Sequence, residues 1–163
     1  MKIRVLPLLG LLCILSVLAC NKSQETLPDS SFFFNCKIDG SDFTAHTDPL
    51  VSFGAHLMNK GEFFNIIGKD KDGNGFTIWL EGPLEEGTFM TQNLNASIQT
   101  SIYYEVIASY QNWNSTGNGG SGAVTIEKNH SNYLEGTFSF TGINATDGSL
   151  KVFTSGSFRA KKL

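Results

Sequence analysis

Apolar and polar residues alternate along most of the sequence after residue 31, and this pattern constrains the fold more than any other feature. Successive side chains of a β-strand point to opposite faces, so a period of two predicts strands with one apolar and one polar face. Antiparallel sheets that pack on one side have this pattern. The inward positions that it predicts are Phe32, Phe34, Cys36 and Ile38, then Val51, Phe53, Ala55 and Leu57, then Phe64 and Ile66, then Phe76, Ile78 and Leu80, then Val124 and Ile126, then Phe138 and Phe140, and finally Val152 and Phe158. We therefore expect an all-β fold, either an antiparallel β-sandwich or a barrel-like sheet.

Turn-forming residues separate these runs and support a chain of many short strands. Asp39-Gly40 predicts a hairpin turn before residues 42–46. Residues 117–122 are rich in glycine, with asparagine and serine, and predict a flexible loop between two strands.

Residues 98–110 are compatible with two structures. Apolar residues recur there at every fourth position from Ile98 to Tyr110, as on one face of a helix. The run from Ile102 to Tyr110 also fits alternation. Its β-branched and aromatic content favours a strand, and a helix remains the alternative.

The first residues predict an exported protein. Lys2 and Arg4 precede an apolar stretch over residues 5–18, which is too short for a bilayer-spanning helix of roughly 20 apolar residues. The stretch ends in Val17-Leu18-Ala19-Cys20, which resembles the lipobox of bacterial lipoproteins, where a cysteine receives diacylglycerol before cleavage. This resemblance implies cleavage before Cys20 and a lipid anchor on it; an ordinary secretory signal with an incidental cysteine is the alternative. Several acyl chains, palmitate among them, would hold the protein on a membrane stably.

The chain is expected to divide into three segments. Residues 1–19 form the signal peptide, residues 20–30 the lipidated cysteine with a flexible polar tether, and residues 31–163 a single all-β domain. Of the three cysteines in the sequence, Cys36 alone remains in this domain, so no intrachain disulfide is expected. The domain must therefore depend on a hydrophobic core, for which its length suffices.

The charge of the chain restricts its partners. The formal net charge is −3, and loss of Lys2 and Arg4 with the signal peptide makes the remainder more acidic. Such a surface argues against nucleic-acid binding and against an electrostatic contact with a membrane. We expect the lipid to be the contact with the membrane.

Short motifs of turn and strand residues mark both ends of the domain. Phe34-Asn35-Cys36-Lys37-Ile38-Asp39-Gly40 precedes Asp42-Phe43-Thr44, and the second half contains Gly122-Ala123-Val124-Thr125-Ile126, Gly136-Thr137-Phe138-Ser139-Phe140-Thr141 and Gly156-Ser157-Phe158. With the lipobox, their order resembles a family of small lipoproteins of unknown function from Bacteroidota. The resemblance implies a β-sandwich-like or barrel-like domain at the cell envelope, and it brings no known catalytic residues.

The same resemblance bears on location. Lipoproteins of that lineage commonly sit in the outer membrane, and some are exported to the cell surface by an acidic signal just after the lipidated cysteine. Residues 21–26 contain a single acidic residue, Glu25. We therefore expect anchorage in the outer membrane, with the periplasmic leaflet favoured over the cell surface.

One calcium-binding sequence motif is matched at every position. Residues 70–75, Asp-Lys-Asp-Gly-Asn-Gly, together with Glu81 match the loop of an EF-hand. That site needs a helix on each side, whereas the flanking residues 62–68 and 76–80 have the composition and alternation of strands.

An extended chain excludes the full site. Along a strand, Glu81 would lie roughly 20 Å from the turn, beyond any shared coordination sphere. We expect an ordinary hairpin tip, with a weaker cation site of Asp70, Asp72 and Asn74 as the alternative.

Other reactive side chains show no catalytic arrangement. His46, His56 and His130 lack the spacing of metal ligands. Cys36 falls on a face predicted to be buried and is expected to be a structural thiol. Glu85-Glu86 lies in a turn with proline and glycine, where solvated charges are usual, and no Gly-x-Ser-x-Gly nucleophile motif occurs. We therefore expect no enzyme activity, no metal and no cofactor.

Tyr110 and Trp113, with the polar residues around them, form an aromatic patch beside the glycine-rich loop. Aromatic faces and amide groups suit sugar rings and peptide surfaces, and loops on a rigid β scaffold often carry binding function. The simpler explanation is that Trp113 covers the end of the core.

Two functions are compatible with the sequence. The first is a noncatalytic, lipid-anchored envelope domain that binds a glycan, a peptide or a partner protein, with Tyr110 and Trp113 as candidate contacts. The second is a lipocalin-like carrier, because thirteen phenylalanines could line a cavity for a small apolar ligand as well as fill a core.

Overall fold

The computed structural model describes residues 32–46, 54–58, 63–92 and 99–162, with the backbone alone over residues 54–58. Within these ranges the chain forms an eleven-stranded sheet and one short 3-10 turn. The strands are β1 (Phe33–Ile38), β2 (Ser41–Thr44), β3 (Gly54–Met58), β4 (Phe63–Lys69), β5 (Gly75–Glu81), β6 (Gly87–Met90), β7 (Gln99–Val106), β8 (Gln111–Asn114), β9 (Ser121–Asn129), β10 (Tyr133–Asn144) and β11 (Leu150–Lys161), with η3 (Ile107–Ser109) between β7 and β8. None of these ranges contains a helix long and apolar enough to cross a membrane. The expected signal peptide, Cys20 and the tether lie outside the described residues.

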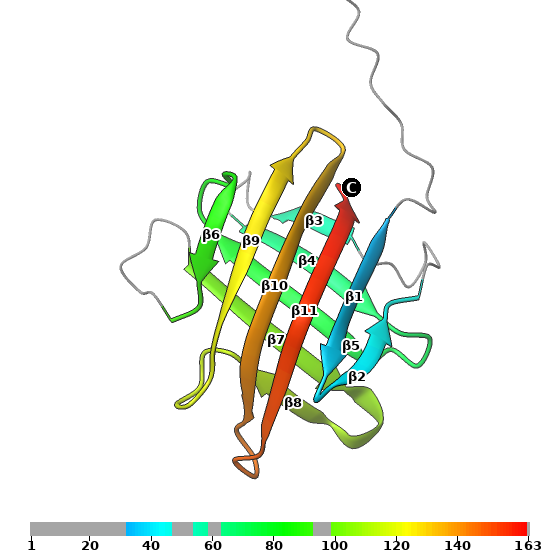
Figure 1. Ribbon diagram of the computed structural model, residues 1–163, viewed down its shortest axis with the longest axis vertical. Coiled ribbons are helices and arrows are strands. Elements are labelled where there is room, and N and C mark those ends of the chain that lie inside the picture. Colours follow the sequence, from blue (N-terminus) through cyan, green and yellow to red (C-terminus); the bar gives the residue numbers. More distant parts are fainter. Residues whose placement is uncertain (1–31, 47–53, 59–62, 93–98, 163) are drawn as a thin grey trace, which may run out of the picture.

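All strand pairs are antiparallel, and the sheet curls over on itself (Figure 1). Its order is β2-β1-β11-β10-β8-β7-β5-β4-β3, and β9 pairs with β10 and with β6. In Figure 1, β6, β9, β10, β11, β1 and β2 form a front layer, and β3, β4, β5, β7 and β8 cross behind it as a back layer. The all-β prediction is confirmed, and the shape is a half-barrel.

The two layers are joined at two corners. β10 pairs with β9 over most of its length, but its last residues, Ile143 and Asn144, pair with β8 of the back layer. At the other corner, the backbone N–H of His46 after β2 donates to the carbonyl of Lys69 at the end of β4, at 2.7 Å. The curl therefore follows from backbone pairing at both sides.

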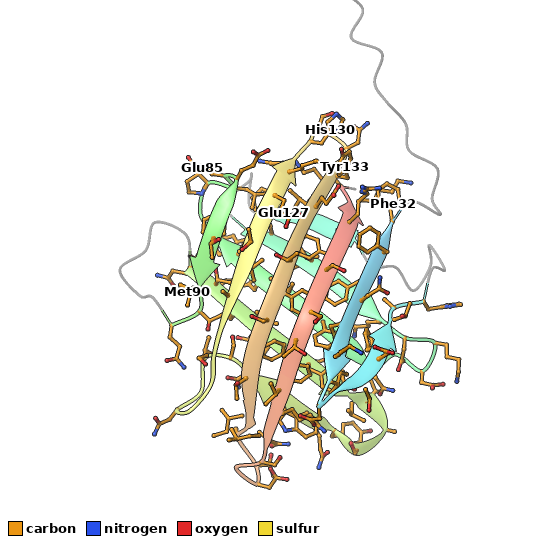
Figure 2. The ribbon with its side chains drawn as sticks, viewed as in Figure 1. Phe32, Glu85, Met90, Glu127, His130 and Tyr133 are labelled. Carbon is orange, nitrogen blue, oxygen red and sulfur yellow. The ribbon has the colours of Figure 1, made fainter. Side chains whose placement is uncertain are left out.

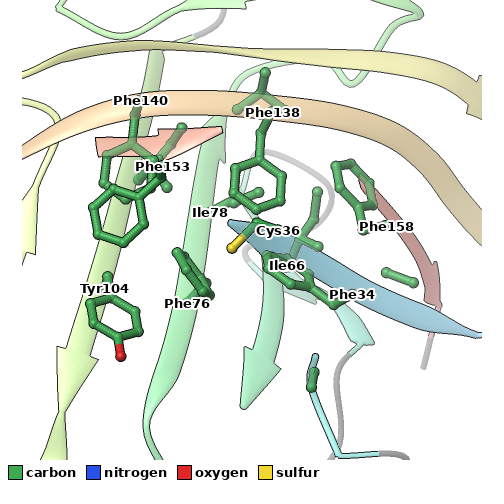
Figure 3. Packing of buried hydrophobic residues seen from close by; sticks show 14 of the residues in the cluster. Phe34, Cys36, Ile66, Phe76, Ile78, Tyr104, Phe138, Phe140, Phe153 and Phe158 are labelled. Carbon is green, nitrogen blue, oxygen red and sulfur yellow. The ribbon is translucent and has the colours of Figure 1, made fainter. Parts of the chain in front are cut away.

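Aromatic rings from both layers fill the space between them (Figure 3). The ring of Phe76 lies with its centroid 5.3 Å from Phe34, 4.9 Å from Phe43 and 4.8 Å from Tyr104. Phe34 of the front layer packs directly on Gly68 of the back layer, where a Cβ atom would lie 2.3 Å from the Phe34 ring. The predicted inward positions that are confirmed as buried in the core are Phe32, Phe34, Cys36, Ile66, Phe76, Ile78, Leu80, Val124, Ile126, Phe138, Phe140 and Phe158.

The predicted inward position of Val152 is wrong. Val152 is 47% exposed, whereas Phe153 is fully buried. Thr154 and Ser155 are both exposed, and Ser155 has a φ of 51°, because β11 carries a bulge there. The extra residue shifts the alternation by one. Phe153 and Phe158 therefore both face inward, although residues whose numbers differ by an odd number lie on opposite faces of a regular strand.

The strand prediction for residues 98–110 is confirmed up to Val106. Ile102 and Tyr104 are buried on the inner face of β7. The alternation then stops at η3, so Ala108 and Tyr110 are exposed. Ile98 lies outside the described residues.

Two predicted connections are confirmed. Asp39 and Gly40, with φ of 49° and 86°, form the hairpin turn between β1 and β2. The glycine-rich segment joins β8 to β9. Val51 and Phe53 lie outside the described residues, and Ala55 and Leu57 lie on β3, whose backbone alone is described.

Candidate functional site

The outer face of the back layer carries an aromatic residue where the strand pattern favours a polar one. In β5, Phe76, Ile78 and Leu80 point into the core, so the residues between them point outward. Trp79 is one of these, and it lies opposite Ser101 of β7. Residues far apart in the sequence thus meet on one surface of the sheet.

These strands and the chain beside them enclose a hollow of about 370 Å³, here called the outer hollow. Its lining consists of Trp79, Gln92, Gln99, Thr100, Ser101, Tyr103 and Thr116. The lining is aromatic, hydroxyl-bearing or amide-bearing, and none of these side chains carries a formal charge. A concave surface with an aromatic wall and a few convergent polar groups is the usual form of a small-molecule site.

The Ser101 hydroxyl, on the outer face with Trp79, has no hydrogen-bond partner within the described part of the chain. The neighbouring Thr100 hydroxyl is also unpaired there, but Thr100 lies opposite Leu80 and faces the core. Ser101 is 3% exposed and Thr100 is 5% exposed. The nearby Ser115 shows the usual situation, since its buried hydroxyl oxygen accepts the backbone N–H of Ile102 at 2.9 Å. A buried polar group without a partner is unfavourable by about 1–3 kcal/mol. Such groups are rare in folded proteins and often mark a functional position.

The ring of Trp79 is held by a second aromatic residue. Phe63 of β4 packs against it with centroids 5.8 Å apart and planes inclined by 12°. Both side chains lie on the outer face and are half-buried. Phe63 limits the motion of the Trp79 side chain. A ligand that stacks on Trp79 therefore binds with little further loss of side-chain entropy.

The rim of the outer hollow is fixed by hydrogen bonds of Gln92. Its Nε2 lies 3.1 Å from the carbonyl of Ser115, 2.9 Å from that of Gly117 and 2.8 Å from that of Gly120. Gln92 itself has a φ of 66°, which turns the chain after β6 toward this loop. The glycine-rich loop is thereby fastened beside the hollow.

The structure separates the two aromatic residues singled out from the sequence. Tyr110 is 95% exposed at the tip after η3. Trp113 is 4% exposed, because β8 places it opposite the buried Tyr104. The Trp113 Nε1–H donates to Ser149 Oγ at 3.1 Å, and Lys151 Nζ lies 4.7 Å from the ring centroid. Trp113 therefore covers the end of the core, and neither residue lines the outer hollow.

The hairpin tip at residues 70–75 is stabilised by its own hydrogen bonds. Asp70 accepts the backbone N–H groups of Asp72 and Asn74, both at 2.9 Å, and the Asn74 amide at 3.1 Å. Lys71 Nζ lies 2.8 Å from the Asp72 carboxylate. Strands β4 and β5 flank the tip, as the alternation predicted, and Glu81 lies at the far end of β5. Over the described ranges no three or more His, Cys, Asp or Glu side chains gather as a metal site.

The remaining reactive side chains lie apart. Cys36 is 4% exposed, as predicted, and burial raises the pKa of its thiol to about 12, so it is a neutral core group at ordinary pH. His130 stacks on Tyr133 with centroids 4.8 Å apart at the turn between β9 and β10 (Figure 2). Glu86 accepts the backbone N–H of Asn129 at 3.1 Å, which ties its turn to β9. His46 is exposed after β2, and the His56 side chain lies outside the described residues.

The residues of the outer hollow are not among those predicted from the sequence as binding residues. One signal was available: Trp79 and Tyr103 are large aromatic residues at positions where alternation predicts a solvent-facing polar residue. Ser101 and Gln92 gave no comparable signal, because serine and glutamine are ordinary on such a face.

Comparison with curated proteins and with solved structures finds no match to this chain. A family model described as Domain of unknown function (DUF6252) matches residues 32–160, from the residue before β1 to the last residue but one of β11. Since this match spans well over half of the sequence and nearly all of the described fold, the chain belongs to the DUF6252 family of domains of unknown function.

Proposed function

We propose that the protein is a lipid-anchored cell-envelope protein whose noncatalytic β domain binds a glycan, a peptide or a protein partner through the outer hollow. The binding part is supported by the buried Ser101 hydroxyl, which has no partner in the described part of the chain and lies beside the partly buried ring of Trp79. A bound molecule with a hydrogen-bonding group would give this hydroxyl a partner and would cover the ring. The site lies on a sheet face and not at the Tyr110 tip.

The anchor is supported by the sequence Val17-Leu18-Ala19-Cys20 and by the polar tether after it. We expect radiolabelled palmitate to enter the wild-type chain and not a Cys20→Ala variant, with the wild-type protein in the outer-membrane fraction. Equal labelling of both chains, or none in either, would contradict the anchor. Protection of the domain from protease on intact cells is expected for the periplasmic leaflet, whereas rapid digestion would place it at the cell surface.

A carrier with an internal cavity, the second function compatible with the sequence, receives less support. The inward rings of the described core pack against one another, with Phe140 and Phe153 stacked at 4.0 Å between centroids. Phe34 and Phe76 from opposite layers are 5.3 Å apart. These contacts favour phenylalanines that fill a core over phenylalanines that line a ligand cavity.

The binding part can be tested without knowing the ligand. The photoreactive residue p-benzoylphenylalanine replaces Thr116, which is exposed and lines the outer hollow, or Leu150, which is 58% exposed on β11 and serves as the control. After irradiation of producing cells, mass spectrometry identifies any adduct. An adduct formed from position 116 and not from position 150 supports the outer hollow as a binding site. Equal adducts, or none, would contradict it.

A further inference from the structure

We propose that the outer hollow binds a neutral glycan chain, with one pyranose ring stacked on Trp79 and one sugar hydroxyl paired with Ser101 Oγ. This inference rests on the proposed function and narrows it to one class of ligand. Three properties of the hollow favour it: its charge, its position on the sheet, and the hydrogen-bonding character of its lining.

The charge of the hollow selects a neutral ligand. The residues that line it are uncharged. An acidic residue, Glu81, pairs in register with the lining residue Gln99. Glu105, farther along β7, has Lys69 as an ion-pair partner at 3.9 Å. Among the described residues, a carboxylated or phosphorylated ligand would thus meet an acidic side chain and no lining cation, which disfavours it.

The position of the hollow disfavours an extended peptide. Peptides commonly bind by adding a strand to a free sheet edge, where the backbone supplies the hydrogen bonds. β5, which carries Trp79, pairs along its length with β4 on one side and with β7 on the other. The backbone beside Trp79 therefore offers no free edge to an added strand, although β7 pairs with β8 only over Tyr103–Val106.

The lining matches the two faces of a sugar. A pyranose has an apolar C–H face, and the partly buried ring of Trp79, packed against Phe63 at 5.8 Å, offers a flat apolar surface for it. Sugar hydroxyls both donate and accept hydrogen bonds. The Ser101 hydroxyl and the exposed Gln99 amide do the same, so each can pair with a hydroxyl in either sense.

The test uses the full-length chain in detergent micelles and calorimetric titration with a panel of neutral oligosaccharides. The panel contains cello-, laminari-, manno-, malto-, xylo- and chito-oligosaccharides, and oligogalacturonate serves as the charged comparison. We expect at least one neutral member to bind and oligogalacturonate not to bind. Trp79→Ala should weaken that binding by about tenfold or more, and Ser101→Ala by about threefold or more. Tyr110→Ala, which removes a more exposed ring away from the hollow, should leave the affinity within about twofold.

Each remaining outcome overturns the inference in a distinct way. Failure of every neutral oligosaccharide, combined with a peptide or protein adduct from position 116, would exclude the glycan but leave the proposed function standing. If no oligosaccharide of the panel binds and no adduct forms at position 116, both the glycan inference and the proposed binding function are contradicted. Glycan binding that Trp79→Ala leaves unchanged, while circular dichroism shows the variant folded, would place the glycan site elsewhere.

Discussion

Ser101 of the outer hollow and the nearby Ser115 are both buried but differ in what their hydroxyl groups contact. Ser115 Oγ accepts the backbone N–H of Ile102 at 2.9 Å, whereas Ser101 Oγ is unpaired in the described part of the chain. We predict that Ser115→Ala lowers the free energy of unfolding by about 1–3 kcal/mol, because it leaves a buried N–H group without an acceptor. Ser101→Ala should leave this free energy unchanged or raise it, because no hydrogen bond is lost.

Urea denaturation of the two variants measures this difference directly. The pair is matched, since each substitution removes one oxygen atom from a nearly inaccessible serine of the same layer. A loss of stability for Ser101→Ala as large as that for Ser115→Ala would show that the Ser101 hydroxyl has a structural partner. That result would remove the main support for the outer hollow as a binding site.

Among the elements, β11 shows how one bulge alters the outcome of an alternating pattern. Ser155 lies in the bulge with a φ of 51°, a left-handed conformation that side chains branched at Cβ tolerate poorly. We predict that Ser155→Val lowers the free energy of unfolding by about 1–2 kcal/mol, whereas Ser155→Gly leaves it unchanged or raises it slightly. Thermal unfolding of both variants is the measurement, and equal effects of valine and glycine would contradict the assigned backbone conformation.

Alternation predicted most strand faces correctly, because one face of each strand is buried and the sequence must supply apolar residues there. It could not predict the bulge, since Thr154 and Ser155 are ordinary strand residues and the shift shows only in the pairing of β11 with its neighbours β10 and β1. The outer hollow was beyond prediction for a related reason. It depends on the pairing of β5 with β7 and on the position of Gln92 against a distant loop. A period of two assigns each residue to a face but does not say which strands are neighbours.

At the scale of the whole molecule, the two layers are in close contact where the Phe34 ring of β1 lies on Gly68 of β4. A Cβ atom at Gly68 would be 2.3 Å from the Phe34 Cγ atom, so an alanine there must displace the ring or separate the layers. We predict that Gly68→Ala lowers the free energy of unfolding by about 1–3 kcal/mol, the range found for overpacked cores.

A double-mutant cycle with Phe34→Leu tests whether this contact between layers is the cause. Leucine replaces the flat ring with a smaller side chain, so it relieves the collision with an alanine at residue 68. Gly68→Ala should lower the free energy of unfolding less in the Phe34→Leu background than in the wild type. The difference should be at least about 0.5 kcal/mol, as expected for residues in contact. If urea denaturation shows that the losses in the free energy of unfolding of the two substitutions simply add, the Gly68→Ala effect arises within β4 alone. Coupling would instead show that aromatic packing sets the spacing of the two layers. This packing and the backbone pairing at the corners would then together stabilise the half-barrel.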